Sequence, residues 1–600
     1  MNWRRLILLT IACGAALTMG AQSRKPDPSW WREARFGMFI HLGLYSVAAG
    51  EWNGEPVEGI GEWIQNFARI PNDAYAELAA DFALQRRAPD AWAEIAERAG
   101  ARYVVFTAKH HDGFCLYPSD VSDFDIELTP CGYDPVKELI AACRRRGLKV
   151  GIYYSHRQDW HEEDAAVMQN EYDGHYGKPK SEVRPDLDRY IREKAVPQVR
   201  ELLGRYGRID LLWYDTPFDL TEEQSRRFVE VVREMQPDCL INGRVGYELG
   251  DYGALGDNEM PCALADRDLE MVATLNHTWG YKKNDRGWKD RKEILCSLIE
   301  SVSRNINYMV NIGPRADGSV PQPSVDVLDF VGEWLRTNSE AIYGATGNPF
   351  NDNFPWGFVT RNGDRIYLHL TRRPADGKIE LRGLNTPVRS VRVLGAKGRL
   401  PVDGRTIRVP EGLEYDRVPV IRLDFGTRPE FSRLNLASEG GIRIPAASGT
   451  IVPGEKGRLR IANGGNTEDF NPGTGKLVLT CEVDEPGTYD IDLYTSRHWR
   501  RSFAEGTEMT LKFDSGEVFA SCPLSQDEEL ENVRKNSYPE TRSRIGTVVF
   551  DRPGTKRMEL SVDRLGRYRR LGFFGEDIRN ESDDNIRVMR LTLTRRAGRN

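Results

Sequence analysis

Residues 90–113 of the 600-residue chain read DAWAEIAERAGARYVVFTAKHHDG, and this stretch indicates how the first half folds. Apolar residues recur at helical spacing from Trp92 to Ala99, so residues 90–99 are expected to form an amphipathic helix. Gly100 ends that helix, and the apolar run 103–108 that follows is typical of a buried strand.

The same helix–turn–strand unit recurs along the first half of the chain. Further strands are expected at 149–155, 209–214 and 239–242, each after a helical pattern, and single strands at 36–40 and 307–312 open and close the series. Nearly continuous apolar strands that alternate with helices are typical of a parallel sheet covered on both faces. We therefore predict an α/β fold, a TIM-like (β/α) barrel over residues 24–336.

The second half has a different pattern, because helical periodicity stops near residue 340. Short alternating runs, such as 365–370 and 418–425, predict antiparallel strands. We expect two all-β sandwich domains, at 340–427 and 430–600. The last domain mixes aromatic and basic residues in HWRR (498–501) and YRR (568–570). It is either carbohydrate-binding or a sandwich packed against the barrel.

The N-terminus has the pattern of a secretory signal peptide over residues 1–23. Arg4 and Arg5 precede the apolar run 6–17, and small residues follow it. That run is too short to span a bilayer, and no other run reaches spanning length. Cleavage before Cys13 to give a lipoprotein is the alternative. We expect an exported protein, in a periplasm or at a cell surface.

Charge and cysteine content exclude several classes of protein. The formal net charge is −7, from 83 Lys+Arg against 90 Asp+Glu, so the chain lacks the basic excess of a protein that tracks nucleic-acid phosphates. The nine cysteines include no CxxC pair and no zinc-like spacing. We therefore expect at most one disulfide and no structural zinc.

Polar side chains stand at the ends of five successive predicted strands. They are His41, the pair His110 and His111, Tyr154, Asp215 and Arg244. Catalytic groups of a (β/α) barrel lie at these strand ends, although any one residue could instead cap a turn or complete the core. A zinc site is the rival interpretation, but adjacent histidines on a strand point to opposite faces, and no HxH or HExxH occurs. We expect no metal.

Asp215 is the strongest catalytic candidate, because it ends an apolar strand where a carboxylate without a function would be expensive to bury. The alternative is a structural Asp that caps the turn after the strand. A retaining glycosidase needs such a carboxylate as nucleophile and a second carboxyl about 5 Å away as acid/base. Glu259 and Glu270 are the candidates for the second group. Both fall in a segment expected to be an irregular loop over the site.

Several motifs together resemble the family of retaining α-L-fucosidases. They include FGMFIHLG (36–43), AKHHDGF (108–114), LLWYDT (211–216), INGRVG (241–246) and LNHTWGYK (275–282). The resemblance covers residues 30 to 320, and the expected sandwich at 340–427 also suits the family. The segment 430–600 is not part of the family's core pattern.

The resemblance implies a role for each matching residue. Asp215 resembles the nucleophile, and Glu270 the acid/base, with Glu259 as the alternative. The residues that resemble the family's sugar-binding set are His41, Trp63, His110, His111, Tyr154, Trp213 and Arg244. No metal or organic cofactor is implied. Leu42 and Leu269 stand where many members of the family have tryptophan, and Leu42 lies beside the expected sugar pocket.

We therefore expect an exo-acting α-L-fucosidase that removes terminal fucose from oligosaccharides or polysaccharides with net retention. Two alternatives remain. One is a retaining α-L-galactosidase or related exo-glycosidase, since the two sugars differ by one hydroxyl. The other is a glycan-binding protein without catalytic activity, in which loss of the Asp215 carboxylate would leave binding intact.

Overall fold

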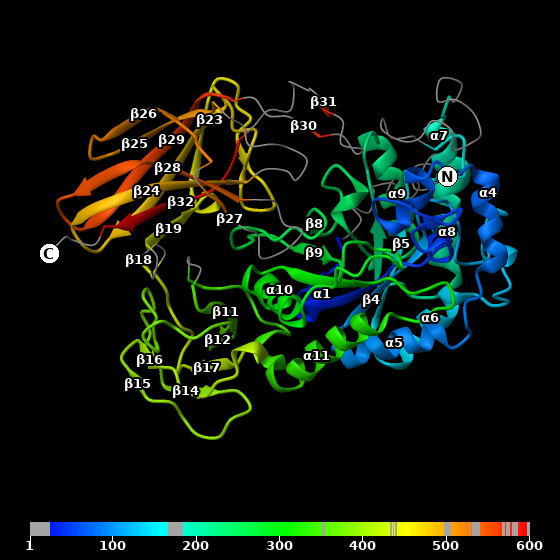
Figure 1. Ribbon diagram of the computed structural model, residues 1–600, viewed down its shortest axis with the longest axis horizontal. Coiled ribbons are helices and arrows are strands. Elements are labelled where there is room, and N and C mark those ends of the chain that lie inside the picture. The colour runs from blue at the N-terminus through cyan, green and yellow to red at the C-terminus, as the bar shows by residue number, and fades with distance from the viewer. Residues whose placement is uncertain are drawn as a thin grey trace, which may run out of the picture.

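The structure is a computed structural model, and it describes residues 25–165, 184–350, 354–432, 435, 437–438, 441–496, 506–526, 528–530, 540–566, 570–571, 577–578 and 586–596. The predicted signal segment 1–23 and residues 498–501 and 568–569 lie outside the described residues. Figure 1 shows the barrel on the right, a middle β-sandwich (β11–β17) at the lower left and a C-terminal β-sandwich (β18–β29 and β32) at the upper left.

Eight parallel strands form one curled sheet in the order β7-β6-β5-β4-β1-β10-β9-β8. They are β1 (Phe36–Ile40), β4 (Tyr103–Lys109), β5 (Lys149–Tyr154), β6 (Leu211–Tyr214), β7 (Leu240–Ile241), β8 (Gly253–Ala254), β9 (Leu269–Ala273) and β10 (Asn307–Ile312). The edge strands β7 and β8 meet, because the Asp251 amide donates to the Ile241 carbonyl at 2.7 Å. The predicted α/β barrel is therefore confirmed.

The strands are buried on both faces, as the continuous apolar runs predict. Every residue of β1, β4 and β10 is buried. Outward side chains such as Met38 and Ile40 join the large core beneath the helices. Inward side chains, among them Phe39, Tyr153 and Trp213, form a separate core inside the barrel. This inner core lies directly below the polar residues at the strand ends, and we refer to it as the floor of the barrel.

Helices cover the outside of most of the sheet (Figure 1). They are α5 (Ala88–Ala99), α6 (Pro135–Arg145), α8 (Val196–Arg205), α9 (Glu222–Met235), α10 (Arg291–Ser303) and α11 (Gln322–Asn338). The helix α5 ends as expected at Gly100, which has a left-handed φ of 84°. The helix α6 is capped by Asp134, which precedes it and whose side chain accepts from the Lys137 amide at 2.9 Å.

The segment between β7 and β9 differs from the sequence-based expectation. It contains a 3-10 turn, η6 (Gly243–Val245), and the short strand β8, but no α-helix. Glu270 was predicted to lie in an irregular loop, and it instead lies in β9, where all five residues are buried. The prediction was wrong because the second residue of the five-residue strand β9 is charged, so the strand lacks a continuous apolar run.

Antiparallel sheets make up the rest of the described chain. In the middle β-sandwich, one sheet holds β11 (Gly357–Asn362), β12 (Arg365–Leu370), β14 (Ser390–Val393) and β17 (Val420–Asp424), and the other holds β13 (Lys378–Glu380), β15 (Val402–Asp403) and β16 (Thr406–Arg408). Its apolar side chains form a core of their own.

The C-terminal β-sandwich has a second independent core between two larger sheets. One sheet holds β18 (Ala437–Ser438), β19 (Gly441–Pro445), β24 (Gly487–Ser496), β27 (Glu528–Leu530), β28 (Glu540–Phe550) and β32 (Arg587–Arg595). The other holds β20 (Thr450–Pro453), β23 (Gly475–Val483), β25 (Glu508–Phe513), β26 (Val518–Pro523) and β29 (Gly554–Arg564).

Two further observations concern export and disulfides. In the described part of the chain, no helix combines the length and the apolar character needed to cross a bilayer. The eight cysteines from Cys115 to Cys522 are unpaired thiols.

Candidate active site

Four of the five predicted strand ends bring their side chains together at one mouth of the barrel. His41 follows β1, His110 and His111 follow β4, Asp215 follows β6, and Arg244 lies in η6 after β7. Arg244 Nη1 donates to Asp215 Oδ1 at 2.9 Å, and His111 Nε2 lies 3.7 Å from Asp215 Oδ2. The ring centres of His41 and His110 are 5.6 Å apart.

Asp215 is a buried carboxylate that is held in its charged form. Its Oδ1 accepts from Arg244 and from the Thr216 amide, both at 2.9 Å, and its Oδ2 accepts from the Tyr153 hydroxyl at 2.9 Å. Burial alone would raise the pKa of Asp215, but the charge of Arg244 and these hydrogen bonds lower it below its usual value. The group can therefore act as a nucleophile or as an electrostatic stabiliser at neutral pH.

The three histidines are neutral at neutral pH. Burial lowers the pKa of His41 to about 3 and that of His111 to about 4. Burial also lowers the pKa of His110. A neutral imidazole has one donor and one acceptor nitrogen, which suits the hydroxyl groups of a sugar.

The neighbours of two rings indicate which nitrogen carries the proton. The Asn311 amide nitrogen donates to a backbone carbonyl, so its Oδ1 accepts from His41 Nδ1 at 2.7 Å. The Ser155 hydroxyl also donates to a backbone carbonyl and accepts from His111 Nδ1 at 2.7 Å. In both rings Nε2 is left with the lone pair.

Tyr154 does not join this group, and the structure corrects that prediction by one residue. The Tyr154 hydroxyl donates to Gln198 Oε1 at 2.8 Å, on the outer side of the sheet under α8. Tyr153 pairs in register with Trp213, and its hydroxyl reaches Asp215. Since side chains alternate along a strand, the residue beside inward-facing Trp213 on the neighbouring strand also faces inward. That alternation was the signal available in the sequence.

Aromatic rings surround the polar group. Trp63 lies in η1 (Gly61–Trp63), and its ring centre is 5.5 Å from that of His111. Trp213 lies beneath Arg244, whose guanidinium carbon is 4.9 Å from the ring centre. Trp279, which the sequence analysis did not assign, lies 5.1 Å from His41 between ring centres. Apolar faces beside hydroxyl-binding groups suit a sugar that carries a methyl group.

Glu270 lies in the floor of the barrel rather than at its mouth. It is fully buried, and it accepts from the Tyr103 hydroxyl at 2.6 Å, from Trp213 Nε1 at 3.0 Å and from the Tyr252 hydroxyl at 3.3 Å. Burial raises the pKa of Glu270. The groups that enclose the carboxyl come from the protein itself, so its position favours a structural role.

The segment 256–261, between β8 and β9, carries two other carboxyls. Asp257 Oδ1 accepts from Arg244 Nη2 at 2.5 Å, and the Asp257 side chain is 47% exposed. Glu259 accepts from the Gly256 amide at 2.8 Å, and burial raises the pKa of Glu259. Sequence reasoning singled out Glu259 and missed Asp257, although both lie in GDNEMP (256–261). Only the contact with Arg244 distinguishes Asp257.

Among the described residues, no group of three or more His, Cys, Asp or Glu side chains is placed to hold a metal ion. His110 and His111 are adjacent in sequence, and their ring centres are 4.2 Å apart. Both line the same mouth as His41, where sugar hydroxyls can reach them.

Comparisons with known proteins agree with this geometry. A protein-family model described as α-L-fucosidase matches residues 16–340, more than half of the chain. An α-L-fucosidase from Vibrio sp. strain EJY3 is 30% identical, with a TM-score of 0.79, over 96% of this chain and 98% of that one. α-L-Fucosidase isoenzyme 1 from Paenibacillus thiaminolyticus is 34% identical, with a TM-score of 0.60, over 66% of this chain and 98% of that one. Tissue α-L-fucosidase from Homo sapiens is 30% identical over 64% of this chain and 86% of its own length.

The floor position of Glu270 predicts a stability effect. Glu270→Ala should remove the shared acceptor of three buried donors and leave a cavity, which destabilises the fold by about 3 kcal/mol or more. Asp257→Ala, at a half-exposed carboxyl of the same segment, should change stability by less than about 1 kcal/mol. Calorimetric unfolding of both variants measures the difference, and equal midpoints would contradict the structural role.

Proposed function

Since the chain belongs to the α-L-fucosidase family and is a glycoside hydrolase, we propose that it removes terminal α-L-fucosyl residues from glycans by double displacement with net retention. The single observation that carries the proposal is the environment of Asp215. This carboxylate is buried at a strand end, is kept ionised by Arg244, and is surrounded by neutral imidazoles and aromatic rings.

In the first step, an Asp215 carboxylate oxygen forms a bond to the anomeric carbon as the bond from that carbon to the leaving oxygen breaks. The leaving oxygen takes a proton from a second carboxyl. In the second step, water gives a proton to that carboxylate, and its oxygen displaces Asp215 from the anomeric carbon. Hydroxyl contacts from the histidines and Arg244 strengthen as positive charge develops on the sugar.

We assign the second carboxyl to Asp257. Retaining glycosidases hold their two carboxyls about 5 Å apart. One guanidinium bridges Asp215 and Asp257 here, through Nη1 at 2.9 Å and Nη2 at 2.5 Å, so the two groups are neighbours. When a sugar hydroxyl accepts the hydrogen bond of Arg244 Nη2 in place of Asp257, the Asp257 carboxyl becomes available for proton transfer. Glu270, which the resemblance implied as the acid/base, instead accepts a hydrogen bond from the indole nitrogen of Trp213.

The natural substrate in this proposal is a fucosylated oligosaccharide or polysaccharide outside the cytoplasm. Export is supported by the basic residues Arg4 and Arg5 before the apolar run 6–17. The Leu42 side chain, expected beside the sugar pocket, packs instead in the large core beneath the helices. The related α-L-galactoside remains the second candidate substrate, because the two sugars differ by one hydroxyl and aromatic rings line the pocket. A pocket of this kind rejects one extra hydroxyl only weakly, by about 1–3 kcal/mol.

The first test is hydrolysis of 4-nitrophenyl α-L-fucoside beside the α-L-galactoside, with Asp215→Asn as the variant. We expect the fucoside to be preferred, and we expect the variant to lose at least ~10³-fold in kcat while it still binds fucose. Preference for the galactoside would change the substrate and keep the mechanism. Undiminished turnover by Asp215→Asn would contradict the assigned nucleophile.

The second test uses two adjacent tyrosines. Tyr153→Phe removes a donor that lowers the pKa of Asp215, so that pKa should rise. Asp215 must be ionised to react, so the acid limb of kcat/KM should move to higher pH, with an activity loss of about tenfold at neutral pH. Tyr154→Phe, the matched control under α8, should leave the acid limb in place. Equal profiles would contradict the role of Tyr153.

The third test separates Asp257 from Glu259. Loss of the general acid slows poor leaving groups more than good ones, by about 10²-fold or more. Asp257→Asn should therefore hydrolyse 4-methoxyphenyl α-L-fucoside much less well than the 4-nitrophenyl fucoside, relative to wild type. Glu259→Gln should keep the wild-type ratio. The reverse result would move the acid/base role to Glu259.

A further inference from the structure

We propose that the hairpin Ala462–Asn466 of the C-terminal β-sandwich is a positioning element of the active site, because it holds the loop 256–262 that carries Asp257. This inference rests on the function proposed above, in which Asp257 protonates the leaving oxygen. It assigns to the segment 430–600 a role in catalysis that does not require that segment to bind a glycan.

One side of the loop is held by the barrel. Asp257 contacts Arg244, and the Asn258 amide donates to the Val272 carbonyl of β9 at 2.8 Å. Lys289 Nζ donates to Asn258 Oδ1 at 2.8 Å. These contacts fix the start of the loop. In its second half, Met260 packs against the barrel core, with the Ser301 hydroxyl of α10 3.9 Å from its sulfur.

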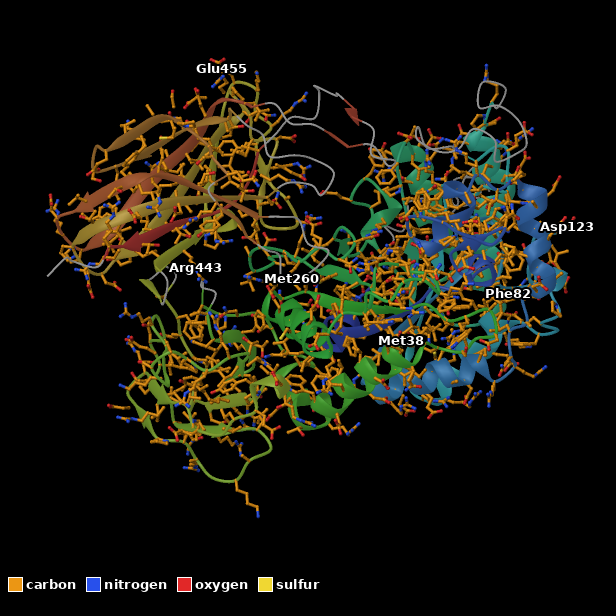
Figure 2. The ribbon with its side chains drawn as sticks, in the orientation of Figure 1. Met38, Phe82, Asp123, Met260, Arg443 and Glu455 are labelled. Carbon is orange, nitrogen blue, oxygen red and sulfur yellow. The ribbon has the colours of Figure 1, made fainter. Side chains whose placement is uncertain are left out.

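The hairpin also contacts that second half, beyond Met260. The Cys262 amide donates to the Gly464 carbonyl at 2.7 Å, which is a backbone bond between the barrel chain and the C-terminal β-sandwich. A Cβ atom added at Gly464 would lie 3.1 Å from Glu259 Oε1, and one added at Gly465 would lie 3.0 Å from Ala263 Cβ. Figure 2 shows Met260, in the middle of this loop, on the side of the barrel that faces the β-sandwiches.

Glycine is favoured at positions 464 and 465 for different physical reasons. Gly465 has a φ of +83°, so the turn itself favours glycine there. Gly464 has no positive φ, and a Cβ atom there would lie 3.0 Å from Asn466 Oδ1 of the same hairpin and 3.1 Å from Glu259 Oε1 of the loop. Close packing against the loop and against the Asn466 side chain, rather than the backbone conformation, therefore favours glycine at 464.

The hairpin is rigidly attached to the C-terminal β-sandwich. Its flanking strands β21 (Arg460–Ile461) and β22 (Thr467–Glu468) pair with each other. The buried Thr467 hydroxyl donates to the Ile586 carbonyl at 3.0 Å and accepts from the Val588 amide at 2.8 Å, beside and within β32. The carbonyl of Gly464 is thus held by the sandwich core and cannot follow the loop freely.

The C-terminal β-sandwich also contributes charge to the loop. Burial raises the pKa of Glu259, and Arg587 of β32 opposes that rise, whereas Glu468 of β22 adds to it. Arg587 and Glu468 pair at 3.2 Å. A carboxyl next to Asp257 is therefore tuned by two residues that lie outside the barrel.

Catalysis is sensitive to this support because no α-helix lies between β7 and β9 to brace the loop. A displacement of about 1 Å at a catalytic group can reduce the rate on the order of 10²-fold. The hydrogen bond from the Cys262 amide to the Gly464 carbonyl supports this loop, where other parts of the barrel are supported by a covering helix.

The test introduces bulk at Gly464 in the full chain. Gly464→Val places a branched side chain against Glu259 and Asn466 at a position that needs no left-handed backbone. Gly426→Val is the matched control, since Gly426 also has no positive φ and nothing lies within 4 Å of its Cβ position. Each variant is assayed with 4-methoxyphenyl and 4-nitrophenyl α-L-fucoside, and the exchange of the Cys262 amide hydrogen is followed by mass spectrometry.

We expect Gly464→Val to lose on the order of 10- to 100-fold in kcat on the methoxyphenyl substrate, with a much smaller loss on the nitrophenyl substrate. Its Cys262 amide should exchange at least tenfold faster than in wild type, and Gly426→Val should match wild type in both measurements. Unchanged exchange at Cys262 would overturn the inference, whether or not the enzyme is active.

The kinetic measurements distinguish the positioning role of the hairpin from the acid/base role of Asp257. If Asp257→Asn shows the leaving-group effect and Gly464→Val does not, the positioning role is wrong and the proposed function stands. If Asp257→Asn shows no such effect, the assigned acid is wrong, and the amide exchange alone then decides whether the hairpin holds the loop.

Discussion

The ion pair between Arg244 and Asp215 is the interaction on which the rest of the site depends. Asp215 is only 8% exposed, so burial opposes its charge. An unpaired buried carboxylate costs several kcal/mol, and it would take up a proton instead. The barrel meets this constraint by ending β6 and β7 side by side, which places the guanidinium 2.9 Å from the carboxylate. The neutral histidines then add hydroxyl-binding groups without competing for that charge.

The same guanidinium links the nucleophile to the rest of the molecule. Its second nitrogen contacts Asp257, the loop beyond Asp257 is bonded to Gly464, and the hairpin around Gly464 is anchored to β32. Hydrogen bonds together with the backbone of residues 257–262 therefore connect the C-terminal β-sandwich to the candidate nucleophile. This arrangement explains how a segment outside the barrel can affect a reaction inside it. The likeness to the Vibrio protein covers this segment as well.

Much of the fold could be predicted from the sequence because buried parallel strands leave clear apolar runs. The expected strands 36–40 and 307–312 match β1 and β10 residue for residue. The site was predicted less completely. Tyr154 was chosen by its place at a strand end, but the alternation of side chains, anchored by Trp213, selects Tyr153. Glu270 was misplaced because its buried partners, Tyr103 and Tyr252, are distant in sequence, and Asp257 was missed because only tertiary structure brings it to Arg244.

The central claim is that Asp215 forms a covalent bond to the sugar, and trapping that intermediate tests it most directly. A fluorine at C2 of a fucosyl fluoride slows both steps by withdrawing charge from an oxocarbenium-like transition state, while fluoride remains a good leaving group, so the intermediate accumulates. We expect peptide mass spectrometry to find one 2-fluorofucosyl group, attached at Asp215. Attachment at Asp257 or another carboxyl, or turnover of natural substrates with inversion and no adduct, would contradict the account.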